Sequence, residues 1–360
     1  MTTYLLAGGG TAGHVNPLLA VADALRQRDR EASVLVLGTR EGLERRLVPE
    51  RGYELLIVDK VPFPRRPNVA ALRFPAAWRR AVAQVTAHLR AHHVDVVVGF
   101  GGYASAPAYV AARRAGIPYI VHEANAKPGL ANILGARRAA AVGTTFPGTP
   151  LRGSTVVGLP LRREIADLDR SATRPDAAAF FGLDPGRPVL LVFGGSLGAR
   201  RLNETLAASW PEIVASGWQI LHAAGERNEV RDPGHPDYRI VPYLDRMDLA
   251  FALADAIVSR SGAATVAEIS ALGIPAVYVP YAVGNGEQAL NAASAVAAGA
   301  ALVIPDAEFT PERVRQQLVP LLSDAAALAE LRAAAAASSA SARAGTANVV
   351  AMIDAAVSGG

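Results

Sequence analysis

The residue types of a ligand site gather in one segment, residues 255–268 (DAIVSRSGAATVAE). The apolar run 255–259 predicts a buried strand, residues 261–262 a turn, and Ala263 the start of a helix. The N–H groups of a helix start have no partner within the helix, so they suit a phosphate or the polar edge of a base. Glu268 follows one to two turns later, where a carboxylate can accept from the vicinal hydroxyls of a ribose. These features indicate a nucleotide site; a solvated Glu after an ordinary loop is the alternative.

A second glycine-rich segment, residues 8–14 (GGGTAGH), follows the first expected strand and precedes a helix expected from about residues 16–17. It satisfies the dinucleotide pattern G-x-G-x-x-G, but the second strand ends at Arg40 without the acid that would hold a ribose. An Arg at this position can bind the 2′-phosphate of NADP, so an NADP site stays an alternative. Thr11 and His14 should project toward the ligand. His14 is the first candidate for a general base because imidazole titrates near neutral pH; a satisfied helix N-terminal residue is its alternative role.

Polar side chains also follow a later strand of the first half. Glu123 and Asn125 come at the end of the strand expected at 118–122, and should point into the same crevice as the loop at 8–14. A buried carboxylate there can take a proton or position a hydroxyl, which makes Glu123 the second candidate for the base. Equally, Glu123 can serve only to brace the loops.

Residues 194–203 (GGSLGARRLN) offer N–H groups and the Ser196 hydroxyl at a helix start, which suits a diphosphate. The segment lacks the Lys-Ser/Thr pair of a P-loop, so ATP hydrolysis is disfavoured. Arg162 can add a charge-assisted contact. No Asp-x-Asp stands at a strand end, so we expect no obligatory metal: the helix dipole and Arg can carry the leaving-group charge. An ordinary tight strand-to-helix turn is the alternative.

The elements that position these residues alternate as short apolar runs, Gly-rich turns and Ala/Leu/Arg helices, which is typical of parallel sheets covered by helices. Strands are expected at 4–7, 33–37, 54–58, 94–99, 118–122 and 140–144, and again at 189–193, 219–223, 239–241, 256–259, 276–279 and 301–304. Both series open alike, with LLAGGG and LLVFGG. We predict two tandem doubly wound α/β domains, 1–162 and 163–344, with a ligand cleft between them and a last helix, about 345–360, packing back on the first domain.

Length and composition bound the class of protein. At 360 residues, with 51% hydrophobic and 19% charged residues, the chain is expected to be globular and to form two domains. The absence of Cys excludes disulfides, a thiol nucleophile and a Cys-based metal site. No apolar run reaches the ~18–20 residues of a membrane span, and the first strand is too short for a signal-peptide core. His88 and His92 lack a third ligand at metal spacing. These features favour a cytoplasmic protein without a structural metal.

The two halves of the chain differ in net charge. Residues 1–162 hold 21 Lys and Arg against 10 Asp and Glu, whereas residues 163–360 hold 15 against 22. In the basic half, Arg alternates with aromatic and aliphatic side chains, which suits the surface of an anionic bilayer. The alternatives are a nucleic-acid partner, which would need a binding fold that the sequence does not show, and a solvated helix. The predicted membrane patch comprises Phe63, Arg65, Arg66, Leu72, Arg73, Phe74, Trp78, Arg79 and Arg80.

Together these motifs resemble the peptidoglycan N-acetylglucosaminyltransferases of glycosyltransferase family 28. The resemblance spans essentially the whole chain and rests on residues 10–14, 99–103, 122–125, 194–203, 260–268 and 287–291. It departs from the common pattern at Ala12, Ala124, Leu197 and Glu287, the last of which puts the grip on the sugar in doubt. The Glu287-Gln288 pair and the Arg-rich composition look like the actinobacterial branch.

The resemblance implies a GT-B fold and an inverting transfer of N-acetylglucosamine from UDP-N-acetylglucosamine to the C4 hydroxyl of lipid I, which yields lipid II. The first domain would bind the acceptor, with Tyr103 on that side, and the second the donor. Glu268 would hold the ribose and Gln288 the sugar hydroxyls. The donor site would comprise Thr11, Ala12, Gly13, Asn125, Arg162, Ser196, Leu244, Ala263, Ala264, Thr265, Val266, Ala267, Glu268 and Gln288.

The resemblance also implies no cofactor beyond the donor substrate. The implied partners are UDP-N-acetylglucosamine, lipid I, anionic membrane lipids and other cell-wall synthesis proteins, with no nucleic acid. The implied location is the cytoplasmic face of the membrane, as a peripheral protein. Three other functions stay open: an NADP-dependent oxidoreductase, a UDP-sugar epimerase on the same architecture, and a non-enzymatic nucleotide sensor.

Overall fold

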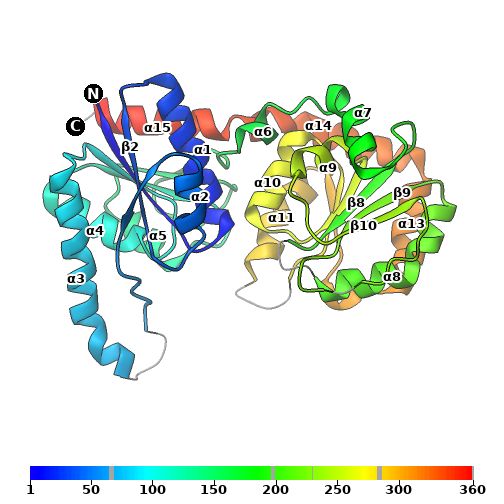
Figure 1. Ribbon diagram of the computed structural model, residues 1–360, viewed down its shortest axis with the longest axis horizontal. Helices are drawn as coiled ribbons and strands as arrows, with labels where there is room; N and C mark the ends of the chain where they lie inside the picture. The colour runs from blue at the N-terminus through cyan, green and yellow to red at the C-terminus, as the bar shows by residue number, and fades with distance from the viewer. Residues whose placement is uncertain (65–68, 196–198, 229, 282–285, 359–360) are drawn as a thin grey trace. The chain divides into compact units, whose positions relative to one another are not determined.

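The computed structural model describes residues 1–64, 69–195, 199–228, 230–281 and 286–358. Arg65, Arg66, Ser196 and Leu197, named above, lie outside the described residues. The chain divides into two compact units, which we call unit 1 (Met1–Arg162 with Ala344–Gly360) and unit 2 (Arg163–Arg343). Each unit is built on one parallel sheet with helices on its faces (Figure 1), so the predicted α/β class is confirmed.

The sheet of unit 1 has the strand order β3-β2-β1-β4-β5-β6-β7, and every pair is parallel. Its strands are β1 Thr3–Ala7, β2 Ser33–Gly38, β3 Glu54–Ile57, β4 Val96–Gly99, β5 Tyr119–Glu123, β6 Ala141–Thr144 and β7 Ser154–Val156. The strand order reverses between β1 and β4. Ligands of open α/β sheets bind at such a point, beyond the carboxyl ends of the strands.

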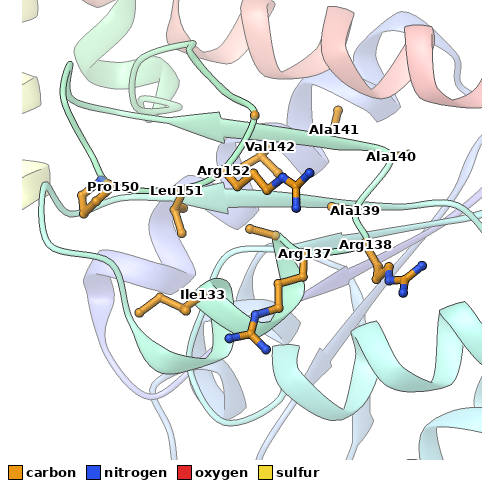
Figure 2. Close-up of a pocket in the computed structure, with 12 residues that line it drawn as sticks. Ile133, Arg137, Arg138, Ala139, Ala140, Ala141, Val142, Pro150, Leu151 and Arg152 are labelled. Carbon is orange, nitrogen blue, oxygen red and sulfur yellow. The ribbon is translucent and has the colours of Figure 1, made fainter.

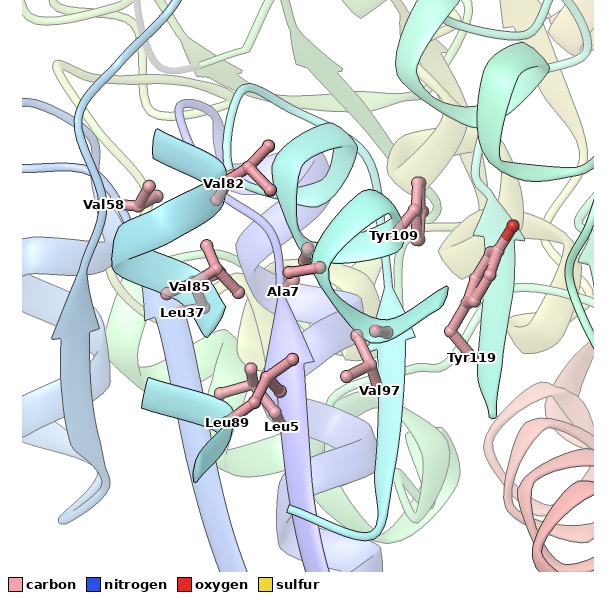
Figure 3. Packing of buried hydrophobic residues seen from close by; sticks show 14 of the residues in the cluster. Leu5, Ala7, Leu37, Val58, Val82, Val85, Leu89, Val97, Tyr109 and Tyr119 are labelled. Atoms are coloured by element: carbon pink, nitrogen blue, oxygen red, sulfur yellow. The ribbon is translucent and has the colours of Figure 1, made fainter. Parts of the chain in front are cut away.

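The helices of unit 1 are α1 Ala12–Arg28, α2 Glu44–Glu50, α3 Val69–Ala91, α4 Ser105–Ala115, α5 Leu130–Gly135 and α15 Gly345–Ser358. The apolar residues of β1 alternate between two cores because successive strand side chains point to opposite faces. Leu5 and Ala7 pack beneath α3 and α4 in the cluster that Figure 3 shows. Tyr4 and Leu6 pack on the other face, against α1 and α15. Burial on both faces explains the nearly continuous apolar run of this strand.

The end of the chain returns to unit 1 because close backbone contacts fix α15 there. A Cβ on Gly345 would lie 2.2 Å from the carbonyl oxygen of Leu159, so only glycine permits this approach. The Thr346 hydroxyl accepts from the Leu161 N–H at 3.1 Å. Helix α14 ends at Arg343 and α15 begins at Gly345, where the sequence predicts the start of the last helix.

The sheet of unit 2 has the order β10-β9-β8-β11-β12-β13 and is also parallel. Its order reverses between β8 and β11. The strands are β8 Val189–Phe193, β9 Gln219–Ala223, β10 Tyr238–Val241, β11 Ala256–Ser259, β12 Ala276–Tyr278 and β13 Ala301–Val303. The helices are α6 Arg163–Ala166, α7 Arg170–Phe181, α8 Arg200–Ala215, α9 Met247–Leu253, α10 Ala263–Leu272, α11 Glu287–Ala297, α12 Pro311–Arg313, α13 Val319–Ser323 and α14 Ala325–Arg343, with a 3₁₀ turn at Asp306–Glu308 and a π turn at Val314–Leu318.

Two elements differ from the sequence predictions. β7 was not predicted, because its three residues are exposed or half-buried and leave no apolar run to detect. Helix α1 begins at Ala12 rather than near residues 16–17. Pro17 suggested a first turn because proline favours that position, yet it lies in the second turn, where it cannot donate to the Gly13 carbonyl. His14 therefore belongs to the first turn of α1.

Candidate active site

The loops after β1 and β4 pack directly against each other at the reversal point of the unit 1 sheet. Gly102 has φ +81°, and a Cβ on it would lie 2.5 Å from the carbonyl oxygen of Gly9. The Ser105 hydroxyl, in the first turn of α4, lies 2.9 and 2.7 Å from the carbonyl oxygens of Ala7 and Gly101 and shares its one hydrogen between them. Glycine at position 102 therefore lets the two loops meet, and the serine ties them together.

The imidazole of His14 lies between these two loops and is half-buried. Its Nδ1 is 3.1 Å from the Gly9 carbonyl oxygen and 3.3 Å from the Thr11 hydroxyl. A carbonyl oxygen can only accept, so Nδ1 carries the proton and Nε2 presents a lone pair. Nε2 borders Gly101, where a Cβ would approach it to 3.2 Å. The ring is thus held in the tautomer that a proton acceptor needs.

Glu123 lies at the end of β5 and is 2% exposed. One carboxylate oxygen accepts from the Asn125 N–H at 2.9 Å. The other accepts from the Gly129 N–H at 3.0 Å and from the Asn132 amide at 2.9 Å. These bonds tie the loop after β5 to α5, so the structure favours the bracing role of Glu123 over that of a base. Asn132 was missed because one buried Asn in a short helix leaves no spacing pattern.

The remaining unit 1 residues predicted for a ligand lie at or near the same edge of the sheet. Thr11 and Ala12 are exposed where α1 begins, and Gly13 and Asn125 are half-buried. Tyr103, in the loop after β4, is exposed, with the Lys60 ammonium 5.2 Å from its ring centroid. Arg162 is half-buried and is the last residue of unit 1 before the chain enters unit 2.

Unit 2 repeats this arrangement at its own reversal point. β8 and β11 are paired, with Phe193 opposite Ser259, so the loops that follow them leave neighbouring strand ends. Gly194 and Gly195 begin the first of these loops. A cavity of about 690 Å³ opens beside them; its lining comprises Gly194, Gly195, Ala199, Arg200, Arg201, Glu204, Asn228, Arg260, Tyr281, Gln288 and Asp306. Its position and size suit a ligand with a diphosphate.

Helix α10 begins at Ala263, as predicted, with Gly262 as its N-cap. The Ser261 hydroxyl just before it is buried without a hydrogen-bond partner in the part of the chain that the structure describes. Glu268 lies in the second turn and is 8% exposed. Leu244, after β10, is buried as well. Residues 263–268 are not among the residues that line the 690 Å³ cavity. Of the predicted donor residues that the structure describes, Gln288 alone lines it.

Arg260 is the charged centre of the cavity wall. Its guanidinium pairs with Asp306 at 2.5 Å, donates to the Val279 carbonyl at 2.9 Å and lies 5.4 Å from the Tyr281 ring centroid. Arg201 of α8 pairs with the same Asp306 at 3.1 Å. One carboxylate therefore holds two arginines at the cavity. Asp306 and Tyr281 were not predicted, because both lie outside the motifs on which the predictions rest.

Helix α11 contacts the loops after β12 and β11 through two side-chain amides. The side-chain amide oxygen Oε1 of Gln288 accepts from the Tyr281 N–H at 2.9 Å. Asn291, one turn on, is fully buried and donates to the Ser261 carbonyl at 3.2 Å. The Gln and Asn of this motif therefore brace the cavity wall and the turn before α10.

Helix α3 carries the part of the predicted membrane patch that runs from Leu72 to Arg80. Leu72 is 82% exposed, and Arg73, Arg79 and Arg80 are exposed around it. The rings of Phe63, Phe74 and Trp78 pack against one another, with centroids 5.5 to 5.8 Å apart, and are half-buried. The three rings thus pack partly against the protein and help to hold α3, while Leu72 and the arginines face outward.

A further cavity, of about 810 Å³, lies at the opposite edge of the unit 1 sheet, where β6 and β7 begin. Arg137, Arg138 and Arg152 line it, as Figure 2 shows, together with apolar residues and backbone. Its position at the amino ends of the strands separates it from the glycine loops. Among the described residues, no helix is long and apolar enough to cross a membrane. Over the same ranges, no cluster of three or more His, Asp or Glu side chains could hold a metal ion.

Comparison with known proteins extends over nearly the whole chain. Residues 4–144 match the glycosyltransferase family 28 N-terminal domain, and residues 189–346 match the C-terminal domain of that family. The chain is 63% identical to the UDP-N-acetylglucosamine--N-acetylmuramyl-(pentapeptide) pyrophosphoryl-undecaprenol N-acetylglucosamine transferase of Clavibacter sepedonicus, over 93% of this chain and 92% of that protein. It is 60% identical to the enzyme of the same name from Leifsonia xyli subsp. xyli, over 98% of both. The crystal structure of Acinetobacter baumannii MurG superposes with a TM-score of 0.77 at 29% identity, covering 98% of this chain and 99% of that one.

Proposed function

The chain belongs to glycosyltransferase family 28, and from that membership we propose that it transfers N-acetylglucosamine from UDP-N-acetylglucosamine to lipid I, undecaprenyl-diphosphoryl-N-acetylmuramoyl-pentapeptide, to form lipid II. Its fold is GT-B, a hexosyltransferase fold with two parallel-sheet domains. The single observation that carries the proposal is the near full-length identity of 60–63% to transferases of that name. These relatives give no support to an NADP-dependent oxidoreductase or to an epimerase.

Unit 2 supplies the donor site in this proposal. The 690 Å³ cavity beside Gly194 and Gly195 takes the diphosphate, with Arg201 and Arg260 in its wall. Glu268 in α10 accepts from the ribose hydroxyls, and Gln288 contacts the sugar. The Ser261 hydroxyl, buried without a partner among the described residues, supports a ligand at the start of α10. The donor contacts expected of Thr11, Ala12, Gly13, Asn125, Arg162 and Leu244 remain part of the proposal.

The chemistry is a single displacement. The acceptor C4 oxygen forms a bond to C1 of the donor sugar as the bond from C1 to the diphosphate breaks, and UDP leaves with the electron pair. The hydroxyl proton passes to Nε2 of His14, which presents a lone pair because Nδ1 donates to Gly9. One displacement inverts the configuration at C1. Glu123, whose carboxylate is occupied by loop donors, holds Asn125 and the loop after β5.

The acceptor is a lipid, so the protein has to meet a membrane surface. We assign this contact to Leu72 and the arginines of α3, which face outward together. Arginine meets lipid phosphate, and an exposed aliphatic side chain enters the headgroup region. The proposed location is therefore the cytoplasmic face of the membrane, as a peripheral protein.

Transfer of labelled N-acetylglucosamine to a short-chain lipid I analogue tests the activity directly. We expect labelled lipid II from the wild-type chain, with or without a metal chelator, and no product when NADP replaces the sugar nucleotide. No transfer by folded protein to this acceptor would overturn the proposal.

Calorimetry tests the donor site separately. Glu268→Ala should weaken UDP binding by about 10-fold or more, since it removes charge-assisted hydrogen bonds to the ribose. Glu330→Ala, an exposed change on α14 of the same unit, should leave the affinity unchanged. Equal UDP affinity in Glu268→Ala and wild type would refute the ribose role.

A further inference from the structure

Glu44, the first residue of α2, is a fully buried carboxylate that no sequence motif singled out. Its Oε2 accepts from the Gly10 N–H at 2.8 Å. Its Oε1 accepts from the N–H and the hydroxyl of Thr39, both at 2.9 Å. No Lys or Arg among the described residues forms an ion pair with it. Acceptance at both oxygens is what an ionised carboxylate provides, so two loop segments compensate this buried charge.

Three glycines create the space that Glu44 occupies. A Cβ on Gly9, Gly38 or Gly42 would lie 2.3, 2.5 or 1.9 Å from atoms of the Glu44 side chain. These glycines come from the loop after β1, the end of β2 and the segment before α2. Glycine at all three positions is therefore a requirement of a carboxylate placed behind the loop at residues 8–11.

The peptide unit between Gly9 and Gly10 connects this carboxylate to the imidazole. Its N–H donates to Glu44, and its C=O accepts from Nδ1 of His14 at 3.1 Å. We propose that Glu44 is a positioning residue: through this peptide it fixes His14 in the tautomer with the proton on Nδ1, so that Nε2 is the acceptor. The arrangement does through one peptide what a carboxylate bound directly to imidazole does in other enzymes.

Two effects follow from the same contact. A peptide is planar, so holding its N–H toward Glu44 also fixes the direction of its carbonyl toward His14. The negative charge on the N–H side strengthens the carbonyl as an acceptor, because hydrogen bonds in series polarise one another. The catalytic consequence rests on the proposed function, since it requires His14 to take the acceptor proton. The effect of Glu44 on the His14 tautomer does not depend on the proposed function.

The test reads the His14 tautomer directly, by ¹⁵N NMR of ring-labelled histidine at a pH of about 8.5, where an ordinary imidazole is neutral. Comparison with His14→Ala assigns the His14 signals. The informative variant is Glu44→Gln, whose amide can keep the Thr39 contacts but turns an NH₂ toward the Gly10 N–H. Glu41→Gln is the matched control, because Glu41 is an exposed residue of the same segment, paired with Lys60 at 3.1 Å.

We expect wild type and Glu41→Gln to show the Nδ1–H tautomer, and Glu44→Gln to lose it as the dominant form. Turnover of Glu44→Gln should fall about 100-fold, the scale of general-base loss. Its affinity for UDP in calorimetry should stay within about twofold, because the proposed ribose and diphosphate groups belong to unit 2. A role in packing alone would lower stability without changing the tautomer.

The Nδ1–H tautomer persisting in folded Glu44→Gln would overturn the proposal. Should that variant fail to fold, wild-type protein with the His14 proton on Nε2 would overturn it equally. Wild-type turnover in His14→Ala would instead remove the base from the proposed function and leave the tautomer result standing. The two failures are therefore distinguishable.

Discussion

The side-chain amide of Asn291 donates a hydrogen bond of 3.2 Å to the backbone carbonyl of Ser261, which joins α11 to the turn before α10. Asn291 is fully buried, so this bond is shielded from water. The turn that it holds carries the Ser261 hydroxyl and aims the first N–H groups of α10. A residue outside the expected ribose contact thereby shapes the proposed donor site.

Replacing Asn291 with Ala should weaken UDP binding by about 5- to 10-fold, the value of one buried hydrogen bond that holds a ligand loop. Isothermal titration with UDP measures this effect. Asn348→Ala is the matched control, since its amide donates to the Val157 carbonyl at 3.0 Å in unit 1. An equal loss of UDP affinity in both variants would show a general loss of stability rather than an effect on the turn.

Glu123→Gln and His14→Ala should separate bracing from proton transfer. Glu123→Gln turns an NH₂ toward loop donors, so we expect a stability loss of about 1–3 kcal/mol with turnover within about 10-fold of wild type. His14→Ala should keep wild-type stability and lose about 100-fold or more in turnover. Urea denaturation measures the stability of both variants, and the transfer assay on the same preparations measures their turnover. The reverse pattern would make Glu123 the base.

Stability should fall in acid because burial lowers the pKa of His122 and of His222 to about 4. The unfolded chain binds these protons near pH 6.5 and the folded chain only near pH 4, so the free energy of unfolding falls as the pH drops through that window. Above pH 6.5 both histidines are neutral in both states. Each should contribute about 3 kcal/mol of this loss.

Urea denaturation at several pH values between about 7 and 4 measures that slope. Replacement of His222, which contacts Tyr238 and Asn203 at 2.8 and 3.0 Å, by Phe should make the slope shallower. His93→Asn is the control: His93 is exposed at φ +49°, a conformation that Asn tolerates. An unchanged slope in His222→Phe would exclude this residue as a source of acid lability.

Membrane contact through α3 should depend on Leu72. Leu72→Asp should weaken binding to anionic vesicles by about 10-fold in co-sedimentation, and higher salt should weaken wild-type binding as it screens the arginines. Phe180→Asp is the matched control, since Phe180 is 61% exposed on α7 of unit 2. Equal binding of Leu72→Asp and wild type would place the contact elsewhere.

Local sequence patterns predicted most of the strands and turns. Apolar runs marked every strand except β7, whose residues leave no buried face. The glycine turns were equally readable, because a turn that ends a strand and starts a helix leaves a local pattern of residue types. The start of α10 at Ala263 was predicted to the residue for that reason.

The roles of the polar side chains near those turns depend on contacts between distant segments and could not be predicted from the sequence. Glu44, Asp306 and Asn291 meet their partners across 34, 46 and 30 residues, through folding of distant segments. The sequence does not distinguish a carboxylate that binds a substrate from one that already accepts hydrogen bonds from backbone N–H groups. Glu123 is of the second kind. Local spacing encodes helices and turns because their contacts are local, whereas the roles of buried polar groups depend on which segments the sheet order brings together.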